Sequence, residues 1–332
     1  MAEARPTIMM AVPRLYELIQ SRILAGVRKA SGLRQKMFMK AVELGRERLR
    51  NGGRLPFSKM ILDALLEILV RSKVRKRFGG RLKAFVSGGG PLTPEVGEFL
   101  TALGIRILQG YGLTESGPVY GVNRPGLVKM DAVGPPLKNT EVRIAEDGEI
   151  LLRGEMVMQG YWRDPALTAQ TVRDGWLHTG DIGELDDDGY LRITDRKKDI
   201  IVNSGGDNIS PQRVEGLLTL EPEIAQAMVH GDRRPHLVGL LVPDSDWLRS
   251  WADSNGCAAD LPALCENADF RAALGGAVER VNKNLSNIER VRRFIVAREP
   301  FTIENRQMTP TMKVRRPQVT AAHKDAIEAM YK

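Results

Sequence analysis

Two glycine-rich stretches carry the residue types that a phosphate-bearing ligand needs. The first, "SGGGPL", contains Gly88, Gly89 and Gly90; the second, "QGYGLTES", contains Gln109, Gly110, Tyr111 and Gly112. Glycine has no Cβ, so a ligand can approach its backbone closely. A structural tight turn explains a glycine run equally well, and Tyr111 between two glycines is placed to stack on a flat ring.

A hydroxyl and a carboxylate follow the second stretch directly. Thr114 offers an oxygen to a phosphate, and Glu115 offers the hard oxygen ligand that magnesium prefers. The alternative is structural: Thr114 caps a following helix and Glu115 complements the helix dipole. The pair alone leaves both interpretations open.

Two further candidate residues, Asp181 and Arg196, lie about 65 and 80 residues after Glu115. Asp181 follows Thr179 and Gly180, and an aspartate that accepts from vicinal hydroxyls is a way to hold a ribose. Arg196, on the far side of a predicted hairpin, is placed to assist. Taken singly, the two residues are equally well explained as a turn residue and a surface charge.

The elements that must position these residues change along the chain. Residues 12–77 have apolar side chains at helical spacing, interrupted by a loop at "NGGRLPFS". From Arg81 the pattern alternates strand, glycine turn, helix, strand and turn, which predicts an α/β sheet. Thr93 or Pro94 is expected to start the helix, with Glu95 in its first turn. The two glycine turns then lie side by side at the carboxyl edge of that sheet, where open α/β sheets bind ligands.

The second half of the chain has a different pattern of apolar and turn-forming residues. Residues 134–194 show short alternating strands with Asp-Gly turns at 147–148 and 188–189, which predict a small β subdomain. The charged cluster "DRKKD" at 195–199 follows, and residues 200–332 alternate helices and strands. They include a capped helix at "SPQRVEGLLTL" and a last helix at "QVTAAHKDAIEAMYK". The prediction is part of a large α/β domain (1–133) with a β subdomain (134–194), a hinge (195–199) and a small α+β domain (200–332).

Composition is that of an ordinary globular protein. The 332 residues are 42% hydrophobic and 27% charged, and the two cysteines are too few for a disulfide framework. No targeting or membrane-spanning segment is recognisable, which favours the cytoplasm. Low aromatic content and the lack of a recognition module argue against a nucleic-acid partner.

The net charge of +8 is unevenly spread. Residues 1–100 hold 20 Lys and Arg against 8 Asp and Glu, a net charge of +12. A solvated basic face explains this bias, and a peripheral position on an anionic membrane surface is a second hypothesis.

Six motifs in order resemble those of the adenylate-forming (AMP-binding) enzymes, and among them the long-chain fatty acyl-CoA synthetases. They are "SGGGPL", "QGYGLTES", "GEILLRGEMVMQGYW", "GWLHTGD", "DRKKDIIVNSGGDNISP" and "MTPTMKVRR". The resemblance implies a ligase that activates a fatty acid with ATP to an acyl-adenylate and passes the acyl group to coenzyme A.

The resemblance also implies a role for each matching residue. Gly88, Gly89 and Gly90 would line the adenine, Tyr111 would stack on it, and Thr114 would hold the α-phosphate. Glu115 would bind Mg²⁺, and Asp181 and Arg196 would hold the ribose of ATP or AMP. Lys198 would lie at the hinge, and Lys313 would reach the α-phosphate and the substrate carboxylate.

The family's Ser/Thr/Gly-rich phosphate loop has no equivalent in this sequence and would precede residue 1. The chain is therefore expected to resemble the C-terminal half of a synthetase and to turn over its substrates slowly or not at all by itself. A homodimer or an association with an N-terminal portion is left open. Two alternatives remain: an adenylating domain for another carboxylic acid, and an inactive adenylate-binding module.

Overall fold

The computed structural model describes residues 3–332, which form two compact units. Unit 1 ends at Thr194 and unit 2 begins at Asp195. Each unit has its own sheets and helices and is described by itself. None of the helices within residues 3–332 combines the length and apolarity that crossing a bilayer requires.

Helices occupy most of residues 13–77 in unit 1, as the apolar spacing predicts. They are α1 (Pro13–Arg28), α2 (Gly32–Arg50), α3 (Phe57–Leu66), the π-helical turn η1 (Glu67–Arg71) and α4 (Ser72–Arg77). The predicted loop at "NGGRLPFS" separates α2 from α3. A second break at residues 29–31, which the apolar spacing did not indicate, separates α1 from α2.

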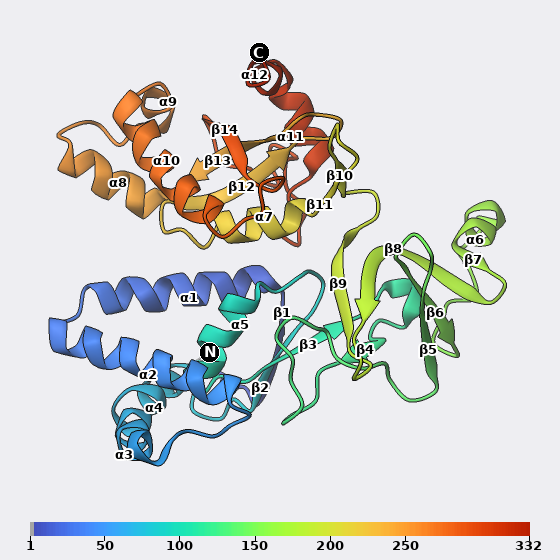
Figure 1. Cartoon of the computed structure of the whole chain (residues 1–332), viewed down its shortest axis with the longest axis horizontal. Helices are drawn as coiled ribbons and strands as arrows, with labels where there is room; N and C mark the ends of the chain where they lie inside the picture. The colour runs from blue at the N-terminus through green and yellow to red at the C-terminus, as the bar shows by residue number, and fades with distance from the viewer. Residues whose placement is uncertain (1–2) are drawn as a thin grey trace. The chain divides into compact units, whose positions relative to one another are not determined.

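A four-stranded sheet carries the first half of the candidate site (Figure 1). Its strands, in spatial order, are β1 (Ile8–Ala11), β2 (Ala84–Ser87), β3 (Ile107–Tyr111) and β4 (Gly121–Val122). The first three are parallel, and β4 is antiparallel to β3. The predicted α/β sheet is confirmed, but β1 was not predicted.

Helix α5 (Pro94–Ala102) connects β2 to β3 and packs against α2. It begins as predicted, with Thr93 at the N-cap and Glu95 in the first turn. Gly45 of α2 permits the contact, because a Cβ there would lie 2.3 Å from the carbonyl oxygen of Ala102. The close packing of α2 on α5 fixes the helix that precedes the second glycine turn.

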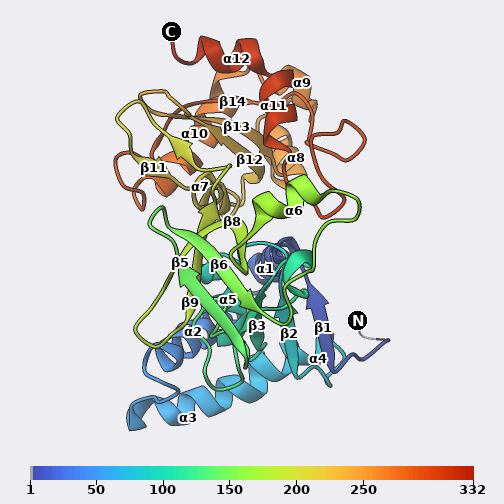
Figure 2. The same ribbon diagram turned by 90° about the vertical axis from the view of Figure 1, so that its right-hand side faces the viewer.

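A second, largely antiparallel sheet forms the rest of unit 1. Its strands are β5 (Thr140–Ile144), β6 (Glu149–Gly154), β7 (Val172–Arg173), β8 (Trp176–Leu185) and β9 (Leu191–Arg196), with helix α6 (Pro165–Thr171) before β7. The Asp-Gly turns at 147–148 and 188–189 join β5 to β6 and β8 to β9, as predicted. Figure 2 looks onto β5 and β6 of this sheet.

Unit 2 is built on a three-stranded sheet with helices on both faces. Its strands are β12 (Ile224–His230), β13 (Leu237–Pro243) and β14 (Val291–Val296), beside a small ribbon of β10 (Ile201–Val202) and β11 (Asn208–Ile209). Its helices are α7 (Pro211–Leu218), α8 (Ser245–Ser254), α9 (Leu261–Leu264), α10 (Ala268–Asn282), α11 (Arg316–Ala322) and α12 (Lys324–Ala329).

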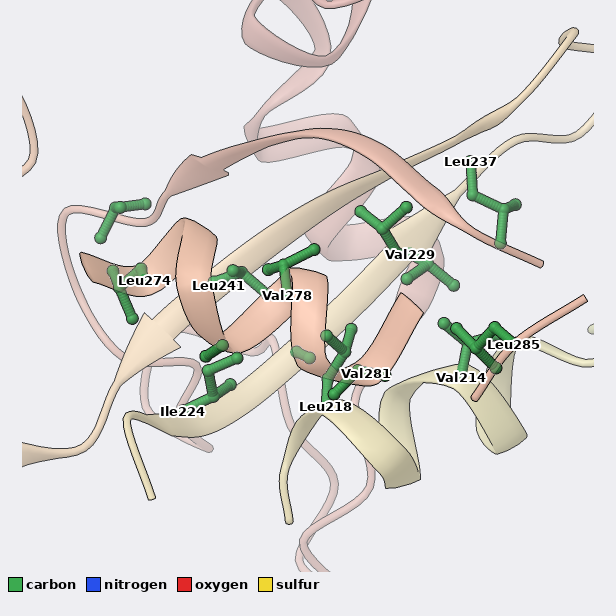
Figure 3. Close-up of a cluster of buried hydrophobic side chains, with 14 of the residues drawn as sticks. Val214, Leu218, Ile224, Val229, Leu237, Leu241, Leu274, Val278, Val281 and Leu285 are labelled. Carbon is green, nitrogen blue, oxygen red and sulfur yellow. The ribbon is translucent and has the colours of Figure 1, made fainter. Parts of the chain in front are cut away.

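Strand β13 explains why unit 2 folds as two layers around a sheet. All seven of its residues are buried, since Leu237 and Leu241 face one core and Val238 and Leu240 face another. A strand covered on both faces is expected to be continuously apolar. Figure 3 shows the first core, where side chains of α7 and α10 meet those of β12 and β13.

The last predicted helix, "QVTAAHKDAIEAMYK", differs from the structure. It is two helices, α11 and α12, which are separated at His323. His323 has φ −115° and ψ 20°, outside the helical range, so the break is a local departure of one backbone residue.

Candidate active site

The carboxyl ends of three parallel strands lie level at one edge of the first sheet. Ala11 of β1 is paired with Ser87 of β2, and Ser87 with Gln109 of β3. The amide of Gly88 donates to the carbonyl oxygen of Ala11 at 3.3 Å. The prediction that the two glycine turns share one edge of the sheet is therefore confirmed.

The positions at this edge are occupied by glycine for different structural reasons. A Cβ at Gly112 would lie 2.1 Å from the carbonyl oxygen of Pro118, so the return of the chain toward β4 requires glycine there. At Gly88 the nearest atom to such a Cβ is 3.7 Å away, an ordinary contact, while Gly89 has a φ of +77° that favours glycine. Packing thus explains Gly112, whereas at Gly88 it leaves room for close approach of a ligand.

Gln109 has a structural partner. Its side chain is 5% exposed, and its Nε2 donates to the carbonyl oxygen of Met130 at 2.6 Å. Asn123 holds the same loop, with its Nδ2 donating to the carbonyl oxygen of Ala132 at 2.7 Å. The amide of Gln109 therefore ties a loop to β3, and its predicted contact with a cofactor stays a prediction.

Tyr111 and Asp181 are brought together from the two sheets of unit 1. The hydroxyl of Tyr111, at the end of β3, donates to Oδ2 of Asp181, in β8, at 2.8 Å. Both residues are buried, at 8% and 4% exposure. The residue expected to stack on the base and the residue expected to hold the sugar are thus hydrogen-bonded neighbours, and the bond fixes the orientation of the carboxylate.

An irregularity in β8 places Asp181. The register between β6 and β8 shifts between Glu149 and Leu151, opposite Thr179–Asp181, and Gly180 takes a φ of +69°. The amide of Gly180 donates to Oε1 of Glu149 at 2.8 Å, and the hydroxyl of Thr179 accepts from the amide of Asp181 at 3.1 Å. Side chains therefore replace the strand pairing here, which is a common arrangement beside functional sites.

His178 contributes to the same support. Its Nδ1 lies 3.4 Å from Oε2 of Glu149, and the hydroxyl of Thr179 donates to the carbonyl oxygen of Ile150 at 2.7 Å. Glu149 was not among the residues predicted from the sequence. The signal for Glu149 was weak, because it lies 31 residues from its partner Gly180.

Thr114 and Glu115 lie in a single 3-10 turn, η2 (Thr114–Ser116). The buried hydroxyl of Ser116 accepts from the amide of Leu113 at 2.9 Å and donates to its carbonyl oxygen at 3.2 Å. The alternative that Thr114 caps a following helix is wrong, because the turn is three residues long and the next element is β4. Ser116 closes the turn in its place.

Tyr161 holds the carboxylate of Glu115, a contact that sequence reasoning missed. Its hydroxyl donates to Oε1 of Glu115 at 2.8 Å, and the amide of Met158 donates to the carbonyl oxygen of Glu115 at 2.8 Å. Burial, and then the hydrogen bond to the carboxylate, raise the pKa of Tyr161, so the phenol remains a donor. The "QGYW" of the third motif was the available signal, but no role was assigned to it.

The other predicted site residues lie in unit 2, which begins with the last two residues of β9, Asp195 and Arg196. Arg196 and Lys198 lie at its start, with Lys198 exposed. Lys313 is exposed on a hairpin closed by a bridge between Met308 and Val314. Within this hairpin the amide of Lys313 donates to Oγ1 of Thr309 at 3.0 Å.

A partly buried ion pair anchors the segment that follows Lys313. Arg316 donates to both carboxylate oxygens of Glu215, at 2.8 and 3.0 Å, and to the carbonyl oxygen of Val229 at 2.7 Å. The amide of Val229 donates back to Glu215 at 2.8 Å. Burial raises the pKa of Glu215, and the charge of Arg316 opposes that shift. The base of the Lys313 hairpin is thereby fixed to α7 and β12.

The donor set around Glu115 can be compared with what magnesium requires. No group of three or more His, Cys, Asp or Glu side chains within residues 3–332 is arranged to hold a metal ion by itself. Magnesium commonly takes one or two carboxylates and fills its shell with waters and substrate phosphates. One carboxylate held by Tyr161 therefore fits an ion that arrives with a nucleotide.

Comparison with protein-family models identifies the class. The model of the AMP-binding enzyme family matches residues 1–162, and that of the AMP-binding enzyme C-terminal domain matches residues 198–332. The chain therefore belongs to the adenylate-forming, AMP-binding enzyme superfamily.

Similar curated proteins include long-chain fatty acid CoA ligases. The long-chain-fatty-acid–CoA ligase FadD15 of Mycobacterium tuberculosis is 36% identical over 338 residues, covering 100% of this chain and 56% of that protein. The peroxisomal long chain acyl-CoA synthetase 6 of Arabidopsis thaliana is 35% identical over 352 residues, covering 100% of this chain and 49% of that protein. The chain thus spans about half the length of these relatives.

Solved structures share the fold. The adenylation domain of a carboxylate reductase from Mycobacterium chelonae has a TM-score of 0.74 at 23% identity, over 99% of this chain and 47% of that one. The A domain of a carboxylic acid reductase from Segniliparus rugosus, in complex with AMP and a co-purified carboxylic acid, has a TM-score of 0.67 at 25% identity, over 99% and 48%. The predicted fold class is confirmed.

Proposed function

We propose that this chain carries the adenylate-binding residues of a long-chain fatty acid:CoA ligase. The observation that carries the proposal is the Tyr111–Asp181 hydrogen bond, which joins the glycine edge of one sheet to the irregular strand of the other. The curated relatives named as long-chain fatty acid CoA ligases support this substrate class.

In the proposed complex, unit 1 holds the nucleotide. The glycine edge at residues 88–90 receives the adenine, and Asp181 accepts from the ribose hydroxyls while Tyr111 keeps its carboxylate oriented. Thr114 donates to an α-phosphate oxygen from the short turn that Ser116 closes. The carboxylate of Asp181 is held by Tyr111 before the ligand arrives, so little reorganisation of this group accompanies binding.

Magnesium, when bound, would neutralise charge that develops on the phosphates. Glu115 would hold it, and Tyr161 would keep that carboxylate pointed in one direction by donating to Oε1. The remaining part of the coordination would come from water and the nucleotide.

Unit 2 supplies the cations of the proposed reaction. Lys313 would approach the α-phosphate and the substrate carboxylate, where its positive charge favours attack of one anion on another. Arg196 would assist at the ribose, and Lys198 would lie at the hinge around which unit 2 changes position before coenzyme A attacks. A flexible ammonium suits a group that serves one half-reaction and not the other.

Binding of non-hydrolysable acyl-adenylates tests this proposal without requiring turnover. Calorimetric titration of the 332-residue chain would compare AMP with palmitoyl-, benzoyl- and aminoacyl-sulfamoyl adenosine. The palmitoyl compound is expected to bind at least about tenfold more tightly than AMP, because burial of several methylene groups contributes. Tighter binding of the benzoyl or aminoacyl compound would instead indicate another carboxylate, and no adenylate binding at all would overturn the proposal.

A further inference from the structure

One hydrogen bond of unit 2 joins the start of the predicted hinge, residues 195–199, to a helix beyond it. Oδ2 of Asp195 accepts from the hydroxyl of Ser210 at 2.6 Å. Asp195 is 4% exposed, so its carboxylate is held inside the fold. A distance of 2.6 Å is typical of a hydroxyl that donates to a carboxylate, which is a strong class of hydrogen bond. We call this contact the Asp195–Ser210 bond.

Asp195 lies near the end of a strand that begins in unit 1. Strand β9 starts at Leu191 and pairs with β8, and its last two residues, Asp195 and Arg196, are the first of unit 2. The other carboxylate oxygen of Asp195, Oδ1, accepts from the amide of Arg196 at 2.6 Å. Burial raises the pKa of Asp195, and the hydrogen bonds from Ser210 and Arg196 oppose that shift. The carboxylate therefore orients the chain as it leaves β9.

Ser210 is attached to the packed part of unit 2. It is the N-cap of α7, and its Oγ accepts from the amide of Arg213 at 3.3 Å while it donates to Asp195. Before it, β10 and β11 are paired with Ile201 opposite Ile209, and both isoleucines belong to the first core of unit 2. The chain from Ile201 to Ser210 is therefore tied to that core.

The segment between these two anchored parts is a short turn. The amides of Asp199 and Ile200 both donate to the carbonyl oxygen of Arg196, at 2.9 and 3.1 Å. Lys197 and Lys198 lie within the turn and are exposed. The turn is thus the part of the chain where backbone angles can change without disturbing the core.

A rotation at Lys198 would change the direction of β9 relative to α7. Asp195 precedes Lys198 and Ser210 follows it, so such a rotation displaces one partner of the Asp195–Ser210 bond from the other. Hydrogen bonds weaken steeply when their distance and angle depart from the preferred range. The bond is therefore compatible with one setting of the hinge.

We propose that Asp195 and Ser210 are positioning residues that hold unit 2 in one of its two positions. Their hydrogen bond breaks when Lys198 changes conformation and forms again when unit 2 returns. This inference rests on the proposed function, in which Lys198 is the hinge and unit 2 changes position before coenzyme A attacks. It adds the groups that set how the two positions are populated.

The same bond is connected to the hairpin that carries Lys313. Ser210 caps α7, and Glu215 of α7 pairs with Arg316 at the base of that hairpin. The positive charge of Arg316 also acts on Asp195 and favours its carboxylate form. Asp195, α7 and the hairpin thus form one connected set, so the hairpin moves together with Ser210 when the bond breaks.

A distance measurement between the two units tests the proposal without requiring turnover. Nitroxide labels would be attached to Cys257, which is exposed in unit 2, and to Gln170→Cys, an exposed position on α6 in unit 1; Cys265 is buried. Double electron–electron resonance then gives the populations of the distances between the labels. One distance is expected to dominate in the protein that retains the Asp195–Ser210 bond.

Two substitutions remove the bond from opposite sides. Ser210→Ala and Asp195→Ala are each expected to change the ratio of the two distance populations about tenfold, because a hydrogen bond to a charged group is lost. Asp195→Asn keeps an acceptor oxygen for Ser210 and should change the ratio less than Asp195→Ala.

Asn267→Ala is the matched control for the loss of a helix cap. Asn267 is the N-cap of α10 and accepts from the amide of Phe270 at 2.9 Å. Its substitution removes a cap of the same kind as Ser210→Ala does, and leaves the hinge unaltered. Asn267→Ala should lower the urea midpoint of unit 2 about as much as Ser210→Ala and retain the distances of the unsubstituted protein.

The outcomes separate the positioning role from general destabilisation and from the adenylate site. Unchanged distances in both Ser210→Ala and Asp195→Ala would overturn the proposal, and so would an equal change of distances in Asn267→Ala. Titration with AMP reports on the adenylate site. Normal AMP binding with unchanged distances would contradict only the positioning role, whereas shifted distances without any AMP binding would contradict only the adenylate site.

Discussion

The two units present their candidate site residues in opposite ways. In unit 1, Tyr111 and Asp181 are buried and bonded to each other, and Glu115 is held by Tyr161. In unit 2, Lys198 and Lys313 are exposed. Hydrogen bonds thus hold three of the site side chains of unit 1, where Thr114 is exposed beside them, whereas unit 2 carries its two lysines at the surface.

This difference indicates that the two units have separate roles in the proposed reaction. Groups that hold a ligand through several steps gain from being fixed in advance. Cations that serve a single half-reaction must approach and withdraw, which an exposed side chain allows. The rigid part of unit 2 is the base of the hairpin, where Arg316 and Glu215 pair.

The largest effect is expected from removing the ion pair at the base of the Lys313 hairpin. Arg316→Ala should lower the free energy of unfolding of unit 2 by about 2 kcal/mol, because it leaves Glu215, a largely covered carboxylate, without its cationic partner. Urea unfolding would be followed by the fluorescence of Trp247 and Trp251, which pack on Phe270, in a background that lacks the unit 1 tryptophans.

The neighbouring Arg315 provides the control, since its side chain is exposed. Arg315→Ala should change the unfolding midpoint little. If Arg316→Ala costs less than about 1 kcal/mol, the ion pair does not support the hairpin.

In unit 1, Tyr161→Phe is the next test. Magnesium should strengthen AMP binding about fivefold less in this variant than in the wild type, because one hydrogen bond to the carboxylate of Glu115 is lost. AMP binding without magnesium should change less. Calorimetric titrations with and without 5 mM MgCl₂ would measure both, and equal loss under the two conditions would show that Tyr161 acts only on the turn and not through the carboxylate.

Acid should destabilise unit 2 in part through the half-buried His323. Burial lowers the pKa of His323, with Glu299 opposing, so the folded state binds fewer protons than the unfolded chain below about pH 6.5. Its contribution to stability is present above that pH and is lost as pH falls through the folded pKa. Asp195 and Glu215, whose pKa values are raised by burial, act in the opposite direction.

Comparison of the wild type with His323→Gln isolates the contribution of this histidine to the pH dependence of stability. The urea midpoint of unit 2 should fall further between pH 7.5 and pH 5 in the wild type than in His323→Gln. Parallel pH profiles for the two proteins would contradict the assignment.

The smallest effect is expected from Lys313→Ala on the binding of AMP. If unit 1 holds the nucleotide, the dissociation constant should change by less than about twofold, within the noise of a surface substitution. A loss of AMP affinity of tenfold or more would contradict the proposal that unit 1 holds the nucleotide.

The sequence predicted the elements whose signals are local. The glycine turns, the two Asp-Gly hairpins and the Ser210-capped α7 follow from residues within a few positions of one another. Strand β1 was missed because four apolar residues beside two prolines give no usable periodicity, and only pairing with β2 makes them a strand. The break at His323 was missed because the apolar pattern continues across it.

Contacts between distant residues could not be predicted in the same way. Tyr161 reaches Glu115 across 46 residues, and Glu149 supports Gly180 across 31. Their residue types are ordinary in the sequence, and their roles depend on how the irregular β8 strand and the 3-10 turn are packed. The motifs indicated which segments meet, but the supporting side chains required the three-dimensional arrangement.

The most direct test of the account compares AMP binding by the wild type with that by Asp181→Ala and the matched control Asp187→Ala, an exposed aspartate near the same strand. Isothermal titration should show a loss of about 10- to 100-fold for Asp181→Ala, as expected when hydrogen bonds to a charged group are removed, and no change for Asp187→Ala. Equal affinity of the wild type and Asp181→Ala would contradict the central claim that Asp181, oriented by Tyr111, holds the nucleotide.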